Sequence, residues 1–211
     1  MNLHKQVTAT ALLLMLFATV GAALVGLTHD TTAEQIERNH QQLLLRRLNT
    51  IMPPDSYDND LLASTITLQA DPLLGLTQDA TAYLATRQGK PVGVVLPAVA
   101  PNGYNGSIHL LVGIYADGRI AGVRITGHRE TPGLGDAIES SRSDWISGFN
   151  GKSLTRPDGK KWKVKRDGGV FDQFTGATIS PRAVVKAVHS ALVYFDRNRE
   201  NLFNPVTRKP A

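Results

Sequence analysis

"DQFTGATISPRAVVKAVHSAL" runs from Asp172 to Leu192 and joins a turn of small, hydroxyl-bearing residues to an amphipathic helix. Ser180 followed by Pro181 is typical of a helix start, because a serine hydroxyl can cap free N–H groups and proline lacks the N–H that a first turn leaves unpaired. Apolar residues then recur at helical spacing, at Val184, Val185, Val188, Leu192 and Phe195. We therefore expect an amphipathic closing helix from Pro181 to about Asn198.

Thr178 lies just before this helix start. The N-terminus of a helix carries free N–H groups and the positive end of the helix dipole, so it favours a phosphate, free or esterified to the threonine. Gly176 and Ala177 add no bulk that would block such a group. The residues alone leave two interpretations open, a phosphate site and a polar lead-in to an ordinary capped helix.

A second loop of interest is "HRETPGLG", from His128 to Gly135. Its glycines would let the backbone approach a flat ligand closely, with Glu130 and Thr131 as polar partners. The alternative is a simple connection from a strand to a helix, with Asp136 as the N-cap and a helix from there to about Ser147. Composition alone favours the simple connection.

The composition of the 211 residues, 42% hydrophobic and 19% charged, is that of a globular chain. The absence of cysteine excludes disulfides, cysteine zinc sites, iron–sulfur ligation and a cysteine nucleophile. The six histidines show no close ligand spacing, so no metal site is predicted. Any redox chemistry would then need a bound organic cofactor.

The N-terminus contains an uncharged apolar run from Val7 to Leu27, about the ~20 residues that a membrane-spanning helix needs. A cleaved signal peptide is the alternative, but its apolar core is usually only ~7–15 residues long. Lys5 before the span places the N-terminus in the cytoplasm and the rest of the chain outside. We expect an anchor over 1–28, an amphipathic stalk helix over 29–55 and an extracytoplasmic domain over 56–211.

Strand patterns fill the middle of the chain. A hairpin is expected around the turn Gln88–Pro91, and a second around Asp117–Gly118, a pair suited to the positive φ angles of a type I′ turn. Cations alternate with apolar residues over 156–166, which predicts a basic strand. That strand is interpreted as solvated, or else as a contact for anionic headgroups or an acidic partner subunit; nucleic acid is not an expected partner. The predicted class is α+β, an antiparallel sheet with packed helices.

The segment Asp172–Thr178 resembles the signature Asp-x-x-[Ser/Thr]-Gly-Ala-Thr of the FMN-binding domain family, in which a flavin transferase joins the phosphate of FMN to the last threonine. "GHRETPGLG", residues 127–135, is similar to a second family segment that lines the flavin. The resemblance covers 100–195. It implies FMN bound covalently at Thr178, and no catalytic side chain. It implies an attachment motif of Asp172, Thr175, Gly176 and Ala177, with Glu130, Thr131, Gly133 and Leu134 beside the isoalloxazine.

With one N-terminal span and this length, the chain resembles the G subunits of Rnf (Rsx) electron transport complexes. That resemblance implies a flavoprotein of the bacterial inner membrane with a periplasmic FMN domain. It would relay electrons in an ion-translocating oxidoreductase that couples transfer between ferredoxin and NAD to ion movement. The implied partners are the other membrane subunits, a flavin transferase and the lipid bilayer. The C subunit of the sodium-translocating NADH:quinone reductase, an FMN-binding sensor, and a periplasmic scaffold or binding protein without flavin remain alternatives.

Overall fold

The computed structural model describes residues 3–204, which fall into two compact units divided between Leu44 and Leu45. Helix α1, Leu3–Ile51, is continuous through the expected anchor and the expected stalk. It ends two residues before Pro53, because proline cannot continue the hydrogen-bonded ladder. The short η1 helix follows at Pro54–Ser56.

The first unit contains an exposed apolar stretch of α1 that is long enough to cross a membrane. Large side chains such as Leu12 and Phe17 are each 67% exposed. The hydroxyls in this stretch bond within the helix itself, as when Thr19 Oγ1 donates to the Met15 carbonyl at 2.8 Å. A helix in lipid needs its polar groups satisfied internally in this way, so the stretch is suited to a bilayer.

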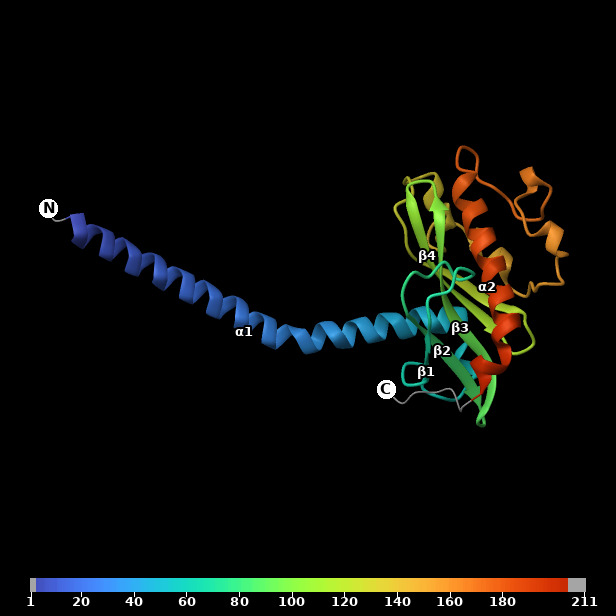
Figure 1. Ribbon diagram of the computed structural model, residues 1–211, viewed down its shortest axis with the longest axis horizontal. Coiled ribbons are helices and arrows are strands. Elements are labelled where there is room, and N and C mark those ends of the chain that lie inside the picture. Colours follow the sequence, from blue (N-terminus) through green and yellow to red (C-terminus); the bar gives the residue numbers. More distant parts are fainter. Residues whose placement is uncertain (1–2, 205–211) are drawn as a thin grey trace. The chain divides into compact units, whose positions relative to one another are not determined.

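The second unit is built on a five-stranded antiparallel sheet in the order β1-β2-β3-β4-β5 (Figure 1). The strands are β1 Thr65–Leu68, β2 Ala80–Arg87, β3 Lys90–Gly103, β4 Gly106–Tyr115 and β5 Ile120–Gly127. Each strand pairs with its chain neighbour, so the sheet is a simple meander. The predicted α+β class is confirmed.

The two predicted hairpins are present, and the turn of the second differs from expectation. Gln88 and Gly89, with φ of 50° and 72°, form the positive-φ pair between β2 and β3. Between β4 and β5 only Gly118 has positive φ, so the expected type I′ turn at Asp117–Gly118 is wrong. The Asp117 carboxylate accepts from the Arg119 backbone N–H instead, which stabilises a longer loop.

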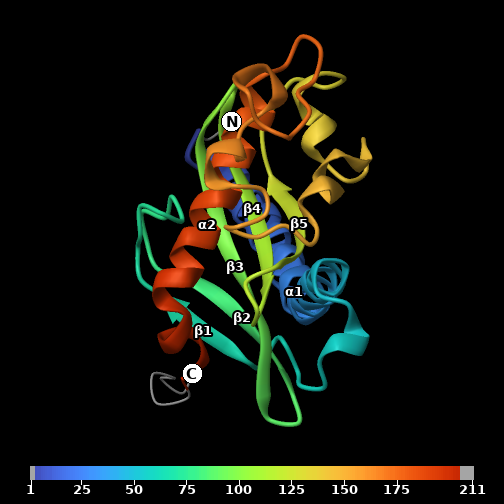
Figure 2. The same ribbon diagram turned by 90° about the vertical axis from the view of Figure 1, so that its right-hand side faces the viewer.

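The closing helix α2, Ile179–Phe203, lies across β3 and β4 on one face of the sheet (Figure 2). It is longer than the predicted Pro181–Asn198. Its buried stripe at Val184, Val188 and Leu192 forms the main core with the sheet. α2 begins at the end of the sheet where β3 turns into β4 (Figures 1 and 2), and that end carries the candidate site.

The opposite face of the sheet contacts the last residues of α1. A Cβ at Gly113 would lie 2.3 Å from Ile51 Cγ2, and one at Gly122 would lie 2.9 Å from the Ile51 carbonyl oxygen. Gly93 likewise faces Met52. Three neighbouring strands therefore use glycine to let the end of α1 approach closely, and both faces of the sheet are covered.

The segment between β5 and α2 consists of turns and short 3-10 helices. These are η2 Gly135–Ile138, η3 Asp144–Phe149, η4 Gly159–Lys161 and η5 Lys165–Asp167. The expected helix from Asp136 to Ser147 is wrong, because the Ser143 hydroxyl donates to the Ala137 carbonyl and accepts from the Trp145 N–H, which starts a new turn.

The expected basic strand over 156–166 is also wrong. The Asp158 carboxylate accepts from the Lys160 N–H and turns the chain at that point, and Gly168 ends η5 at a φ of 84°. Trp162 and Val164 are nevertheless buried while the neighbouring lysines are exposed, so the alternation of apolar and basic residues survives without a strand. Sequence periodicity does not distinguish these two ways of burying alternate residues.

Candidate flavin-binding cleft

The signature segment forms a tight turn directly before α2. The Ala177 N–H donates to the Phe174 carbonyl at 3.1 Å, and Gly176 between them has a φ of 81°. Such a turn needs positive φ at its third residue, which glycine adopts without strain. Thr178 occupies the N-cap position of α2, and its side chain makes no capping hydrogen bond.

Ser180 does not cap the helix, contrary to the sequence-based expectation. α2 already begins at Ile179, and Ser180 lies inside its first turn with no exposed surface. Its hydroxyl donates a short hydrogen bond to the carboxylate of Glu130, fifty residues earlier in the chain. An N-cap lies outside the first helical turn, so the start of α2 at Ile179 rather than at Pro181 accounts for the difference.

The loop from His128 to Gly135 closes on itself around Thr131. The Thr131 carbonyl accepts from the N–H groups of Leu134 and Gly135, each at 3.1 Å, and Gly133 has a φ of 77°. This turn exposes 45% of the Leu134 side chain. Asp136 is buried beside Arg142 rather than acting as an N-cap, since η2 has no side-chain cap.

The two predicted segments meet at one cleft of ≈ 260 Å³. Its lining is Tyr104, Glu130, Thr131, Leu134, Gly135, Gly176, Ala177, Thr178, Ile179 and Ser180. Six of the nine predicted site residues are among these. Gly133, Asp172 and Thr175 lie outside the lining and belong to the turns that shape it.

Tyr104 is a cleft residue that the sequence did not single out. It lies between β3 and β4 and is 68% exposed. Four large apolar side chains are exposed among described residues 45–204, and three of them, Tyr104, Leu134 and Ile179, line this cleft. The sequence does show an aromatic residue beside the Asn105–Gly106 turn. Only the fold shows that this residue lies near the signature segment.

Glu130 is buried to 4% exposure between two glycines. A Cβ at Gly103 would lie 2.7 Å from Glu130 Oε1, and one at Gly135 would lie 2.8 Å from Oε2. The Glu130 N–H donates to His128 Nδ1 at 2.9 Å, so the hydrogen-bond pattern assigns the His128 proton to Nε2, which lies 2.8 Å from Glu139. The loop is thus held by its own backbone and by buried polar groups.

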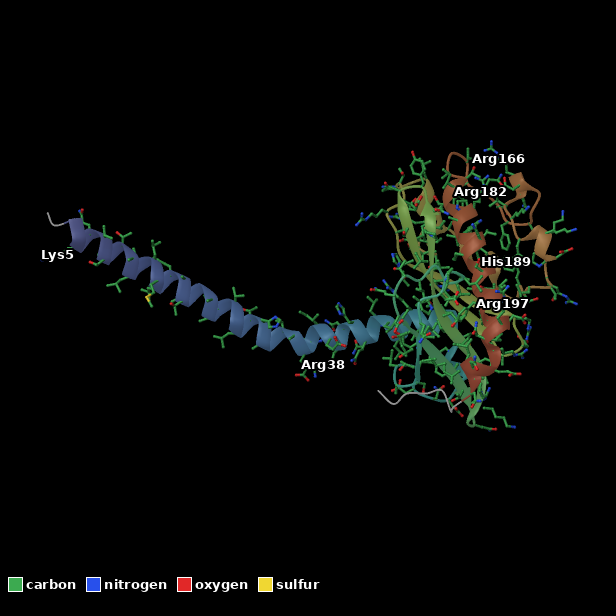
Figure 3. All side chains as sticks on the ribbon, viewed as in Figure 1. Lys5, Arg38, Arg166, Arg182, His189 and Arg197 are labelled. Atoms are coloured by element: carbon green, nitrogen blue, oxygen red, sulfur yellow. The ribbon has the colours of Figure 1, made fainter. Side chains whose placement is uncertain are left out.

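The signature turn is held from outside by exposed contacts. Asp172 forms an ion pair with Lys165 at 2.5 Å, and its carbonyl accepts from Trp145 Nε1 at 2.8 Å. One turn into α2, Arg182 forms a two-pronged pair with Asp167, which lowers the pKa of the Asp167 carboxyl through the hydrogen bond. Figure 3 shows Arg182 at the same end of the domain as Arg166.

The donor set of this cleft fits FMN. The first turn of α2 offers backbone N–H groups and a positive dipole end for a phosphate. The Thr178 hydroxyl makes no capping bond, and Tyr104, Leu134 and Ile179 provide apolar surface for a flat ring. Among residues 3–204 there is no group of three or more histidine or acidic side chains that could hold a metal ion.

Two protein-family models match this chain, and a solved structure is similar to it. Residues 103–193 match the model of the FMN-binding domain, and residues 1–51 match that of the RnfG N-terminal region. A crystal structure of Shewanella oneidensis NqrC aligns with a TM-score of 0.48 and 26% identity over 71% of this chain and 72% of that one.

Curated relatives match almost the whole chain. The G subunit of the ion-translocating oxidoreductase complex of Pseudomonas aeruginosa (strain UCBPP-PA14) is 51% identical over 96% of this chain and 94% of the relative. The G subunit of the same complex from Vibrio cholerae serotype O1 (strain M66-2) is 48% identical over 92% of this chain and 92% of the relative. The chain therefore belongs to the family of G subunits of ion-translocating oxidoreductase complexes, with an FMN-binding domain over 103–193.

Proposed function

We propose that the chain relays electrons through FMN joined by a phosphoester to Thr178. The observation that carries this proposal is the cleft itself, where two segments about forty residues apart meet beside a threonine at a helix start. In the attached state the Thr178 oxygen is bonded to phosphorus in place of its proton. The free N–H groups at the start of α2 would then stabilise the phosphate, because the helix dipole favours negative charge there.

The ring of the flavin would lie against the apolar side chains of the cleft. Tyr104, Leu134 and Ile179 offer contact surface, while Thr131 offers a polar partner and Gly133 sets the turn that presents Leu134. When bound, FMN supplies the electron-transfer chemistry, and the protein positions it and limits its contact with water. No side chain needs to act as a catalyst in such a relay.

The complex implied by the relatives' name would supply the partners. We propose that α1 anchors the chain in the lipid bilayer, and that other membrane subunits deliver and remove electrons in a ferredoxin- and NAD-linked, ion-translocating process. Lys5 before the apolar run favours a cytoplasmic N-terminus and a periplasmic flavin domain. A covalent tether is useful there, because lost FMN could not readily be replaced outside the cytoplasm.

The attachment is tested by co-expression with a flavin transferase, followed by a denaturing gel viewed for flavin fluorescence. We expect a bright wild-type band, a dark Thr178→Ala band and a bright Thr175→Ser band, since serine keeps the hydroxyl that the signature requires. A dark wild-type band would reject the covalent flavoprotein. A bright Thr178→Ala band would move the site elsewhere, and His109→Ala and His128→Ala would then be compared.

The orientation is tested separately with single cysteines, because the natural chain has none. Ser107→Cys lies on β4 and is exposed. In intact spheroplasts, a membrane-impermeant maleimide should label this variant without detergent. Labelling that appears only after the membrane is dissolved would place the domain in the cytoplasm.

A further inference from the structure

The carboxylate of Glu130 joins three separate segments of the second unit. Among the described residues, the buried polar or charged side chains are Glu130, Asp136 and Ser180, all in or beside the cleft. Oε2 of Glu130 accepts from the Ser180 hydroxyl, and Oε1 accepts from the Asn105 N–H at 3.3 Å. The Glu130 side chain thus links its own loop to the start of α2 and to the β3–β4 turn.

Each of those segments contributes one apolar wall of the cleft. The β3–β4 turn carries Tyr104, the loop carries Leu134, and the start of α2 carries Ile179. Within residues 3–204, the hydrogen bonds that join these segments use the Glu130 carboxylate or the adjacent Arg129 carbonyl, which accepts from the Asn105 side chain at 2.8 Å. Of these groups, the Glu130 carboxylate alone bonds both of the other segments, whereas the Arg129 carbonyl bonds only the β3–β4 turn.

The surroundings are built around that carboxylate. A side chain at Gly103 or Gly135 would collide with one of its oxygens, and one at Gly135 would also come within 2.7 Å of Ser180 Oγ. Both carboxylate oxygens are turned toward these partners, and 4% of the residue is exposed. A residue that met the flavin directly would need to present its polar atoms to the cleft.

We propose that Glu130 is a positioning residue that fixes the three walls of the cleft through Ser180 and Asn105. The claim that these walls hold the isoalloxazine rests on the proposed function. The geometry of the walls belongs to the protein without flavin. The alternative, in which Glu130 is chiefly a direct polar partner of the ring, becomes an outcome of the test.

Three substitutions separate these roles. Glu130→Ala removes both bonds. Glu130→Gln keeps the shape, because the amide oxygen can accept from the Asn105 N–H while the amide nitrogen donates to the Ser180 oxygen. Ser180→Ala removes the bond to α2 alone and keeps the carboxylate, so it also serves if Glu130→Ala does not fold.

The first measurement is hydrogen exchange by mass spectrometry on the full chain in detergent, made without flavin transferase. We expect Glu130→Ala to speed exchange roughly tenfold in peptides over both 103–110 and 178–188, which contain the hydrogen-bonded amides of β4 and of α2 from Arg182 onward, as the loss of a buried bond should. Ser180→Ala should speed exchange over 178–188 alone, and Glu130→Gln should restore wild-type rates. Unchanged exchange over both peptides in Glu130→Ala and Ser180→Ala would overturn the proposal.

The second measurement is the fluorescence anisotropy of the flavin attached to the same variants. Positioning predicts a loss of anisotropy in Glu130→Ala that Glu130→Gln restores, with the flavin still attached. A second outcome is an equal loss of anisotropy in Glu130→Ala and Glu130→Gln, although Glu130→Gln has wild-type hydrogen exchange. That outcome would make Glu130 a direct flavin contact and overturn the proposal. Because the exchange measurement uses no flavin, a dark wild-type gel band would reject the proposed function while the exchange result still decides the positioning role.

Discussion

Two of the segments that form the cleft, the loop wall and the attachment wall, are held in opposite ways. The loop wall, residues 128–135, is fixed from within by the buried Glu130 carboxylate and by glycines that leave room for it. The attachment wall, residues 172–178, contains exposed and part-buried residues but no buried one, and it is held by the surface ion pair of Asp172 with Lys165. One wall is anchored by a buried carboxylate, whereas the other is anchored by a contact at the surface.

This difference suits two separate tasks. A rigid loop wall can present a fixed shape to a flavin ring, as a largely preformed ligand site does. An attachment wall held at the surface leaves Thr178 part-exposed and without a capping hydrogen bond, as a target of a modifying enzyme needs to be. The comparison leads to a simple rule: changes in the loop wall should lower the stability of the fold, whereas changes in the attachment wall should lower flavin attachment and leave stability nearly unchanged.

The largest effect on stability is expected from Gly135→Ala. The new Cβ would lie 2.7 Å from Ser180 Oγ and 2.8 Å from Glu130 Oε2, and crowding of this kind costs about 2 kcal/mol in the free energy of unfolding. Gly133→Ala is the matched control, because its Cβ meets nothing within 4 Å and only its φ of 77° is strained, at about 1 kcal/mol.

Urea unfolding followed by tryptophan fluorescence measures both changes, since the chain has two tryptophans and both lie in the second unit. Equal midpoints for Gly135→Ala and Gly133→Ala would mean that the crowding at Gly135 is relieved by movement of the loop. The loop wall would then be no more rigid than the attachment wall.

A smaller effect on stability, within about 0.5 kcal/mol, is expected from Asp172→Ala, because it removes one exposed ion pair. Its effect should fall on flavin attachment, which we expect to drop several-fold on the denaturing gel. Asp196→Ala is the matched control, an exposed acid on α2 that lies outside the signature. Full attachment in Asp172→Ala would remove this residue from the attachment motif.

The smallest effect is expected from the exposed pair of Asp167 and Arg182. The hydrogen bond from Arg182 lowers the pKa of Asp167 in the folded protein, so the pair stabilises the fold above the ordinary carboxyl range near pH ~4. That stabilisation is lost as the pH falls through the lowered folded pKa. The Tm of wild type should exceed that of Asp167→Asn slightly at neutral pH, and the gap should close in acid. A gap that is constant with pH would contradict this assignment.

The sequence predicted the sheet and closing helix well because their signals are local. Alternation marked β5, and the spacing of Val184, Val188 and Leu192 marked α2. The region between them was predicted wrongly because serine, proline and glycine divide it into short turns, and apolar residues such as Trp162 are buried without a regular period.

The same distinction applies to the cleft. Thr178 and its neighbours could be found from a continuous signature, and the loop around Leu134 from a second one. The bond between Ser180 and Glu130 and the place of Tyr104 depend on contacts across fifty or more residues, which no local pattern contains. Ser180 even carried a misleading local signal, since its position before Pro181 indicated a helix cap.

Peptide mapping of the flavin-loaded protein tests the central claim most directly. Trypsin should release the peptide 167–182, which contains both Thr175 and Thr178. We expect this peptide to be heavier by one FMN less one water, with fragment ions that assign the added mass to Thr178. An unmodified 167–182 peptide from a fluorescent protein, or fragment ions that assign the mass to Thr175, would contradict the account.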